Sequence, residues 1–202
     1  HSEQGHAVKS MILSENFDAN DGTYKSPSKP GLGIEIENTG FVDRFRERVM
    51  FPIHSFSGRI LGFGGRALNP NAKAKYQNSP ESPIYNKSKV LYGIFFAKNS
   101  ISKKNNCFLV EGYTDVISLH QKGIENVVSA SGTSLTIEQI KLINRFTKNI
   151  TILFDGDNAG IKASFRGVDM ILKEGMNVKV VPFPDNEDPD SFAQKSSEEE
   201  LS

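Results

Sequence analysis

The chain is poor in the features that mark disulfide-bonded, secreted and membrane proteins. Its one cysteine, Cys107, excludes a disulfide scaffold and any cysteine-rich zinc site within these 202 residues. No stretch reaches the roughly 18 to 20 apolar residues that a membrane-spanning helix needs. The amino terminus lacks both an apolar signal segment and an initiator methionine. We therefore expect a cytoplasmic piece of a longer protein, with no membrane partner and with Cys107 buried as an inert thiol.

Patterns of several common enzyme classes are absent as well. The sequence contains no Walker A motif, no H-E-x-x-H zinc motif and no nucleophile elbow. The glycine-rich run at residues 62–65 does not fit the dinucleotide-binding fingerprint. The chemistry must therefore come from another arrangement of side chains.

Charge is balanced overall but divided along the chain. The sequence has 24 basic and 24 acidic side chains, yet residues 41–104 hold 12 basic against three acidic ones, and residues 105–202 hold nine against 15. A basic segment beside an acidic one suits a protein that holds a polyanion near bound cations. Two solvated faces with a chance asymmetry remain the simpler alternative.

The basic part, residues 1–104, reads as a lobe with short antiparallel strands. Two strand-like runs at 48–53 and 59–66 flank a Ser57-Gly58 turn, and Pro52 indicates that the first run is an edge strand or that the strand ends there. Residues 15–33 are rich in Asn, Asp, Gly, Pro and Ser, which predicts a mobile loop.

The acidic part, residues 105–202, alternates between strand and helix patterns. Strands are expected at 107–110, 126–130, 150–154 and 178–183, with helices at 114–122, 136–146 and 159–174. Short strands rich in Val, Ile, Leu and Phe between helices predict a mostly parallel sheet covered on both faces. The expected fold class is α/β in this part and α+β overall.

Acidic side chains gather where the predicted strands end. Glu111 and Asp115 follow the first strand, Asp155 and Asp157 follow the third, and Asp188 and Asp190 follow the fourth. The carboxyl ends of parallel strands meet at one edge, where α/β sheets bind ligands. Carboxylates gathered there would repel one another unless cations neutralised them.

Oxygen ligands without cysteine or histidine favour Mg²⁺ or Mn²⁺ over zinc. Two such ions about 4 Å apart would serve phosphoryl transfer. The competing interpretation is structural, because a single Asp after a strand is more often a helix cap than a metal ligand. Three separate clusters in one sheet are harder to explain by capping.

The same residues resemble a known family. EGYTDV at 111–116, ASGTS at 130–134, DGDNAG at 155–160 and EDPD at 187–190 resemble the ordered motifs of a TOPRIM domain, which primases, topoisomerases and some nucleases share. RFRERVMFPI at 44–53, GFGGR at 62–66, KYQNSPE at 75–81 and LYG at 91–93 resemble bacterial DnaG-type DNA primases. The resemblance runs from about Asp43 to Gln194.

This resemblance implies roles for individual residues. Glu111, Asp155 and Asp157 would be catalytic, and the metal ligands would be Glu111, Asp155, Asp157, Asp188 and Asp190, with Asp115 as a supporting acid. Nucleic acid or nucleotide phosphates would meet Arg66, Lys75, Asn78 and Lys87. The same role is less specific to Arg44, Arg46 and Arg48, because arginines on short strands often only brace neighbouring carboxylates.

The implied function is a DNA-dependent RNA polymerase domain that makes short RNA primers on single-stranded DNA. Its implied cofactors are two or more Mg²⁺ or Mn²⁺ ions, and its partners are the template, NTPs and the RNA primer. The longer parent would also meet a replicative helicase and single-strand-binding protein at the bacterial replication fork, and the fragment alone would be weakly active or inactive. A TOPRIM nuclease or topoisomerase fragment, and a non-catalytic single-stranded DNA-binding module, remain alternatives.

Overall fold

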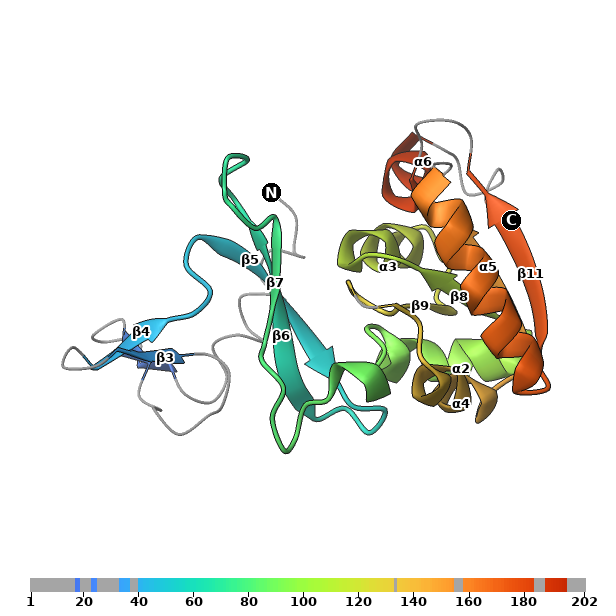
Figure 1. Cartoon of the computed structure of the whole chain (residues 1–202), viewed down its shortest axis with the longest axis horizontal. Helices are drawn as coiled ribbons and strands as arrows, with labels where there is room; N and C mark the ends of the chain where they lie inside the picture. Colours follow the sequence, from blue (N-terminus) through green and yellow to red (C-terminus); the bar gives the residue numbers. More distant parts are fainter. Residues whose placement is uncertain are drawn as a thin grey trace. The chain divides into compact units, whose positions relative to one another are not determined.

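The computed structural model describes residues 17–18, 23–24, 33–36, 40–132, 134–154, 158–183 and 188–195 of the chain (Figure 1). The chain divides into two compact units. Unit 1 holds His1–Met50 and Phe63–Ser82, and unit 2 holds Phe51–Gly62 and Pro83–Ser202. The predicted domain boundary between residues 104 and 105 stays a prediction.

The described residues before Arg48 include two short antiparallel strand pairs, which the sequence did not predict. β1 (Phe17–Asp18) pairs with β2 (Thr23–Tyr24), and β3 (Gly33–Ile36) pairs with β4 (Gly40–Asp43). The predicted loop at 15–33 thus contains a small strand pair, and its other residues before Gly33 lie outside the described part of the chain.

Three further strands form a sheet in the order β5-β6-β7, with β5 (Arg48–His54) at one edge, β6 (Ile60–Ala67) in the middle and β7 (Tyr76–Asn78) at the other edge. The edge position of β5 confirms the interpretation of Pro52, which lacks the N–H that a central strand needs. β7 and the 3-10 helix η1 (Lys87–Lys89) lie in a region expected to be loop.

A four-stranded parallel sheet forms the centre of unit 2. Its order is β11-β10-β8-β9, and the strands are β8 (Cys107–Val110), β9 (Val127–Ser129), β10 (Asn149–Phe154) and β11 (Asn177–Pro182). All three neighbouring pairs are parallel. The prediction of a parallel sheet is confirmed, and each strand lies within two residues of its expected bounds.

Five helices accompany this sheet: α2 (Ile94–Lys104), α3 (Tyr113–Gln121), α4 (Ile137–Asn144), α5 (Asn158–Lys173) and α6 (Pro189–Lys195). The sequence predicted α3, α4 and α5 but not α2 or α6. α2 lies between backbone positions in the left-handed region, Gly93 with φ 86° and Asn105 with φ 48°. α6 begins at Pro189, directly after Asp188, and such an Asp-Pro pair is a helix-start signal as well as a turn signal.

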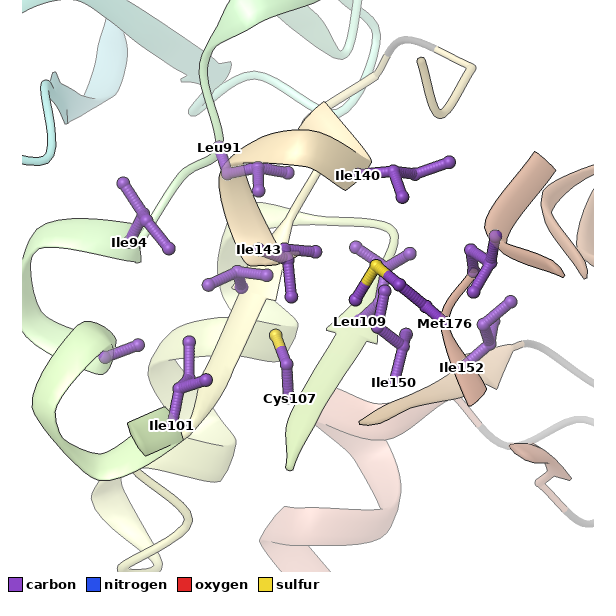
Figure 2. Close-up of a cluster of buried hydrophobic side chains, with 13 residues drawn as sticks. Leu91, Ile94, Ile101, Cys107, Leu109, Ile140, Ile143, Ile150, Ile152 and Met176 are labelled. Atoms are coloured by element: carbon purple, nitrogen blue, oxygen red, sulfur yellow. The ribbon is translucent and has the colours of Figure 1, made fainter. Parts of the chain in front are cut away.

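Alternate residues of the strands enter different cores. Leu109, Ile150 and Ile152 pack with α2, α4 and α5 in the larger cluster, and Figure 2 shows these apolar side chains gathered around Cys107 and Met176. Val110 and Leu153 pack instead with α3 and α6. The sheet is therefore covered on both faces, since successive side chains of a strand point to opposite sides.

A smaller aromatic cluster contains Phe51, Tyr85 and Tyr113. The ring of Tyr113 stacks on Phe51 with centroids 4.8 Å apart and meets Tyr92 edge to face. Tyr113 is therefore a packing residue and not an exposed platform for a nucleic-acid base. Within the described residues, no helix is both long and apolar enough to cross a membrane.

Candidate active site

The strand order creates a switch point between β8 and β10. β9 lies beside β8 on one side, and β10 lies on the other side, so the chain crosses back over β8 between β9 and β10. The helix that follows β8 packs on one face of the sheet, while α4 and α5 pack on the opposite face. The helices that follow β8 and β10 therefore lie on opposite faces, and α/β sheets bind their ligands in the crevice at such a switch point.

Glu111 lies at this switch point. It directly follows Val110, the last residue of β8, and Leu109 pairs with Ile152 of β10. Continued by two residues, this register would bring Glu111 level with Phe154, the last residue of β10. Glu111 is exposed, so its carboxylate is accessible to solvent and ligands.

A buried serine anchors the backbone of Glu111. Ser129 Oγ donates a hydrogen bond of 2.6 Å to the Glu111 carbonyl and accepts one of 2.8 Å from the Ser131 N–H. Ser129 is fully buried, and Ser131 has a left-handed backbone with φ 54°. The end of β9 therefore determines where the chain leaves β8.

Asp115 has a structural partner in the first turn of α3. Its Oδ2 accepts a 2.7 Å hydrogen bond from the Gly112 N–H, and the side chain is buried. A Cβ at Gly112 would lie 3.0 Å from the same oxygen. Asp115 thus closes the start of α3, directly after Glu111.

Asp188 and Asp190 belong to the start of α6. Asp188 Oδ1 accepts a 2.6 Å hydrogen bond from the Ser191 N–H, and Ser191 Oγ accepts one of 3.0 Å from the Asp188 N–H. Asp190 Oδ1 accepts a 2.5 Å hydrogen bond from Ser118 Oγ on α3. The α3–α6 contact therefore holds this acidic turn beside the helix that follows Glu111.

Asp155 and Asp157 lie outside the described residues, so their meeting with Glu111 stays a prediction. Among the residues that the structure does describe, no group of three or more His, Cys, Asp or Glu is arranged to hold a metal ion. The exposed Glu111 carboxylate is nevertheless the kind of oxygen donor that hard divalent cations prefer. Burial raises the pKa of the Cys107 thiol, so this side chain is unsuited to metal binding.

The predicted basic residues have diverse surroundings. Arg48 donates to the carbonyls of Gly65 (3.2 Å) and Ala74 (3.0 Å), and more weakly to Lys75, so it braces backbone rather than carboxylates. Arg44 Nε is buried without a hydrogen-bond partner in the structure.

Two of the predicted phosphate ligands flank an exposed aromatic ring. The guanidinium carbon of Arg66 lies 5.8 Å, and Lys75 Nζ 6.0 Å, from the centroid of Tyr76. Asn78 ends β7 of the same sheet, and Arg46 is exposed in the turn before β5. Lys87 lies in η1. Its backbone carbonyl accepts a hydrogen bond of 3.1 Å from Gln139 Nε2.

Known proteins match both parts of the chain. Residues 3–98 match the model of the DNA primase catalytic core, N-terminal domain, and residues 108–193 match a Toprim-like model. A DNA primase of Halalkalibacterium halodurans is 47% identical over 176 residues, which cover 87% of this chain and 29% of that protein. The chain belongs to the DnaG-type primase family.

Solved primase structures share the fold. A DNA primase domain from Pseudomonas aeruginosa has a TM-score of 0.78 at 43% identity, covering 85% of this chain and 54% of that one. The Aquifex aeolicus primase with zinc-binding and RNA polymerase domains has a TM-score of 0.80 at 39% identity, covering 84% and 42%. A DnaG primase catalytic domain bound to ssDNA has a TM-score of 0.77 at 40% identity, covering 84% and 56%.

The chain spans less than a third of the length of these curated primases and about half of that of the solved primase structures. Membership of the DnaG-type family settles the mixed α/β fold and the Toprim character of the carboxyl-terminal part, and a Toprim domain in a primase implies the use of divalent metal in general.

The sequence did not reveal the two serines that hold Glu111 and Asp190 in place in this DnaG-type chain. Ser129 and Ser118 hold the Glu111 backbone and the Asp190 carboxylate, respectively. No motif marks Ser118, whose partner lies 72 residues away in the chain. Ser191 was detectable, because Asp188-Pro189 followed by Ser191 fits a helix cap that bonds back to its third residue.

Proposed function

We propose that this chain is the polymerase part of a bacterial primase and joins ribonucleotides into short RNA primers on single-stranded DNA. The observation that supports the proposal most is the place of Glu111, exposed at the switch point of the sheet and level with the end of β10, directly before Asp155. The family relation supports the same activity for the longer parent protein.

The proposed site holds two or more Mg²⁺ or Mn²⁺ ions. Its ligands are Glu111, Asp155, Asp157, Asp188 and Asp190. When bound, the ions neutralise the charge that builds on the reacting phosphate and on the leaving pyrophosphate. The hydrogen bonds of Asp188 to the Ser191 N–H and of Asp190 to Ser118 Oγ hold both carboxylates at the start of α6, beside α3.

The reaction is an in-line displacement. A 3′-hydroxyl attacks the α-phosphate of an incoming NTP, the bond to the β-phosphate breaks, and pyrophosphate leaves. Glu111 binds an ion or accepts the proton of the attacking hydroxyl, while Asp115 keeps the start of α3, and thereby Glu111, in position. Because little covalent chemistry falls to the protein, catalysis rests on positioning and charge neutralisation.

Basic side chains hold the template, the primer and the triphosphate in this proposal. Arg66 and Lys75 suit phosphate contacts, and both lie near the exposed ring of Tyr76. Asn78, Lys87, Arg44 and Arg46 are further contacts. Arg48 takes a different place, because its guanidinium already bonds backbone carbonyls and shapes the loop that carries Lys75.

The same proposal places the parent protein in the bacterial cytoplasm at the replication fork. Its partners there would be a replicative helicase and single-strand-binding protein. The 202-residue chain by itself is expected to fold and bind metal but to initiate primers poorly.

The test is primer synthesis by the parent protein on single-stranded template with NTPs and Mg²⁺. Glu111→Gln keeps the size of the side chain but removes its charge, and it should abolish synthesis without changing the fold. Glu138→Gln, at an exposed acid in the first turn of α4, is the matched control and should remain active.

Two outcomes would contradict the proposal. Near-normal synthesis by Glu111→Gln would remove Glu111 from the mechanism. Strand cleavage without NTPs would favour a nuclease or topoisomerase, and metal-independent DNA binding without any synthesis would favour a non-catalytic module.

A further inference from the structure

A surface of unit 2 combines exposed aromatic rings with positive charge. The turn of the β5–β6 hairpin presents Phe56, which is 45% exposed, and the first turn of α2 presents Phe96, which is 52% exposed. Large exposed aromatic side chains are costly in water and commonly mark binding sites. We call Phe56, Arg59, Phe96, Lys98 and Arg145 the hairpin–α2 surface.

Specific contacts fix this surface in place. Lys98 Nζ donates a 2.8 Å hydrogen bond to the Phe56 carbonyl and lies 4.6 Å from the centroid of Phe95. Gly58 of the turn has φ +93°, and a Cβ there would come within 2.7 Å of the Phe95 ring. The hairpin turn is thus seated on α2, and its close approach requires glycine.

Arg145 adds a third segment to the surface. It caps the carboxyl end of α4, and its guanidinium carbon lies 4.9 Å from the centroid of the Phe56 ring. A cation over an aromatic face is a favourable arrangement, and it leaves guanidinium N–H groups for an anion. The hairpin, α2 and α4 therefore bring aromatic rings and cations together.

The charge of these segments has one sign. The hairpin residues 51–62 and α2 contain no acidic side chain, while Arg59, Lys98 and Arg145 are cationic. Glu125 accepts a hydrogen bond from Ser100 Oγ and interacts with Lys103 and Lys104, all in the second half of α2. The half of α2 that carries Phe96 and Lys98 keeps its positive charge.

We infer that the hairpin–α2 surface binds single-stranded nucleic acid by stacking bases on Phe56 and Phe96 and holding phosphates with Arg59, Lys98 and Arg145. Exposed rings among cations are the pattern that binds single strands without sequence preference, because every base has a face that can stack. An acidic protein segment would also be attracted by the charge, but it does not account for two exposed rings beside the cations.

The hairpin–α2 surface is separate from the catalytic site proposed at Glu111. Arg145 precedes the first residue of β10 by only a few positions, so it lies toward the amino ends of the strands. Glu111 follows the carboxyl end of β8, at the opposite edge of the sheet. The hairpin–α2 surface would therefore engage a stretch of strand away from the reacting nucleotides, and its function needs neither metal nor NTP.

A local fluorescent reporter tests the inference. The chain has no tryptophan, so Phe96→Trp introduces a single one. Leu172→Trp is the matched control, because Leu172 is similarly exposed (55%) and also helical, on α5. Titration with an oligothymidine of about 16 nucleotides in EDTA should quench the fluorescence of Phe96→Trp and leave that of Leu172→Trp unchanged.

Two substitutions in the Phe96→Trp protein separate the contribution of base stacking from that of phosphate binding. Phe56→Ala should weaken the quenching titration by about fivefold or more, as the loss of one stacked base predicts. Arg145→Gln should lower the slope of log Kobs against log salt by about 0.7, whereas Lys173→Gln on α5 should leave it unchanged. Circular dichroism and thermal melting establish that each variant is folded.

The inference is wrong if the oligonucleotide binds by anisotropy while Phe96→Trp is not quenched. It is equally wrong if a polyglutamate peptide, and not the oligonucleotide, quenches that reporter, because the surface would then serve an acidic protein segment. Neither result bears on primer synthesis, and an inactive Glu111→Gln leaves this inference untouched.

Discussion

Removing the hydroxyl of Ser129, at the end of β9, should destabilise the backbone at Glu111, directly after β8. Ser129→Ala deletes the Oγ that donates to the Glu111 carbonyl at 2.6 Å and accepts from the Ser131 N–H at 2.8 Å. Because Ser129 is fully buried, the alanine leaves both groups without this partner. A buried polar group that loses its partner costs about 1 to 3 kcal/mol, and we expect a total loss of about 2 kcal/mol.

Thermal unfolding measures this loss. For a chain of this size, about 2 kcal/mol corresponds to a decrease of roughly 4 to 8 °C in Tm. Ser100→Ala is the control, since it removes a hydrogen bond to the exposed Glu125 and should change stability by less than about 0.5 kcal/mol. The parent protein with Ser129→Ala should also need more Mg²⁺ for primer synthesis. A Tm equal to that of Ser100→Ala would refute the view that Ser129 anchors Glu111.

Two further predictions concern a helix cap and a thiol. Asp188→Ala removes the acceptor for the Ser191 N–H and should destabilise α6 by about 1 kcal/mol, measured by urea denaturation, whereas Asp188→Asn should retain most of that stability. Cys107 is buried and its pKa is raised by burial, so the folded protein should not react with a thiol reagent until it unfolds. Because the unfolded chain loses this proton first, stability should fall as pH rises above about 9, by up to roughly 1.4 kcal/mol per pH unit. Cys107→Ala should lose this contribution and keep that of Tyr92, whose pKa burial raises to about 12. Rapid labelling of folded protein at neutral pH would contradict the burial of this thiol.

Much of unit 2 was predictable because its strands are short and apolar and its helices are amphipathic. The four strands and three of the five helices agree with the sequence patterns within about two residues. The hairpin of β5 and β6 was equally clear, because the turn at Gly58 separates two β-type runs.

The missed helices have physical reasons. α2 carries consecutive apolar residues at its start, Ile94 and Phe95 beside the exposed Phe96, so its apolar face is not distinct from its solvent face in the sequence. α6 is short and rich in polar residues, and its stability comes from the capping pair Asp188 and Ser191 and from packing on α3. Neither helix has a strong periodic pattern of its own.

Some features of the candidate site were also visible in the sequence, and others were not. The placement of Glu111 after a strand was visible in the sequence, and so was its carboxylate character. That Asp115 closes α3, that Asp190 bonds Ser118 and that Arg48 braces backbone carbonyls depends on contacts between distant residues. Such contacts leave no periodic trace, because serine and arginine have many possible partners and only the packing of the chain selects one.

By itself, the sequence determined the succession of the four parallel strands and of the three helices between them, the acidic residues that follow the strands, and the exclusion of disulfide and cysteine-rich zinc chemistry. These follow from local side-chain patterns, which depend on neighbours a few residues away. Only the tertiary structure decided that β10 lies beside β8, that the helices divide between two faces, and that the β5–β6 turn joins α2 and α4 in one basic aromatic surface. Those pairings are set by the burial of apolar surface between distant segments, and that burial is a property of the whole fold.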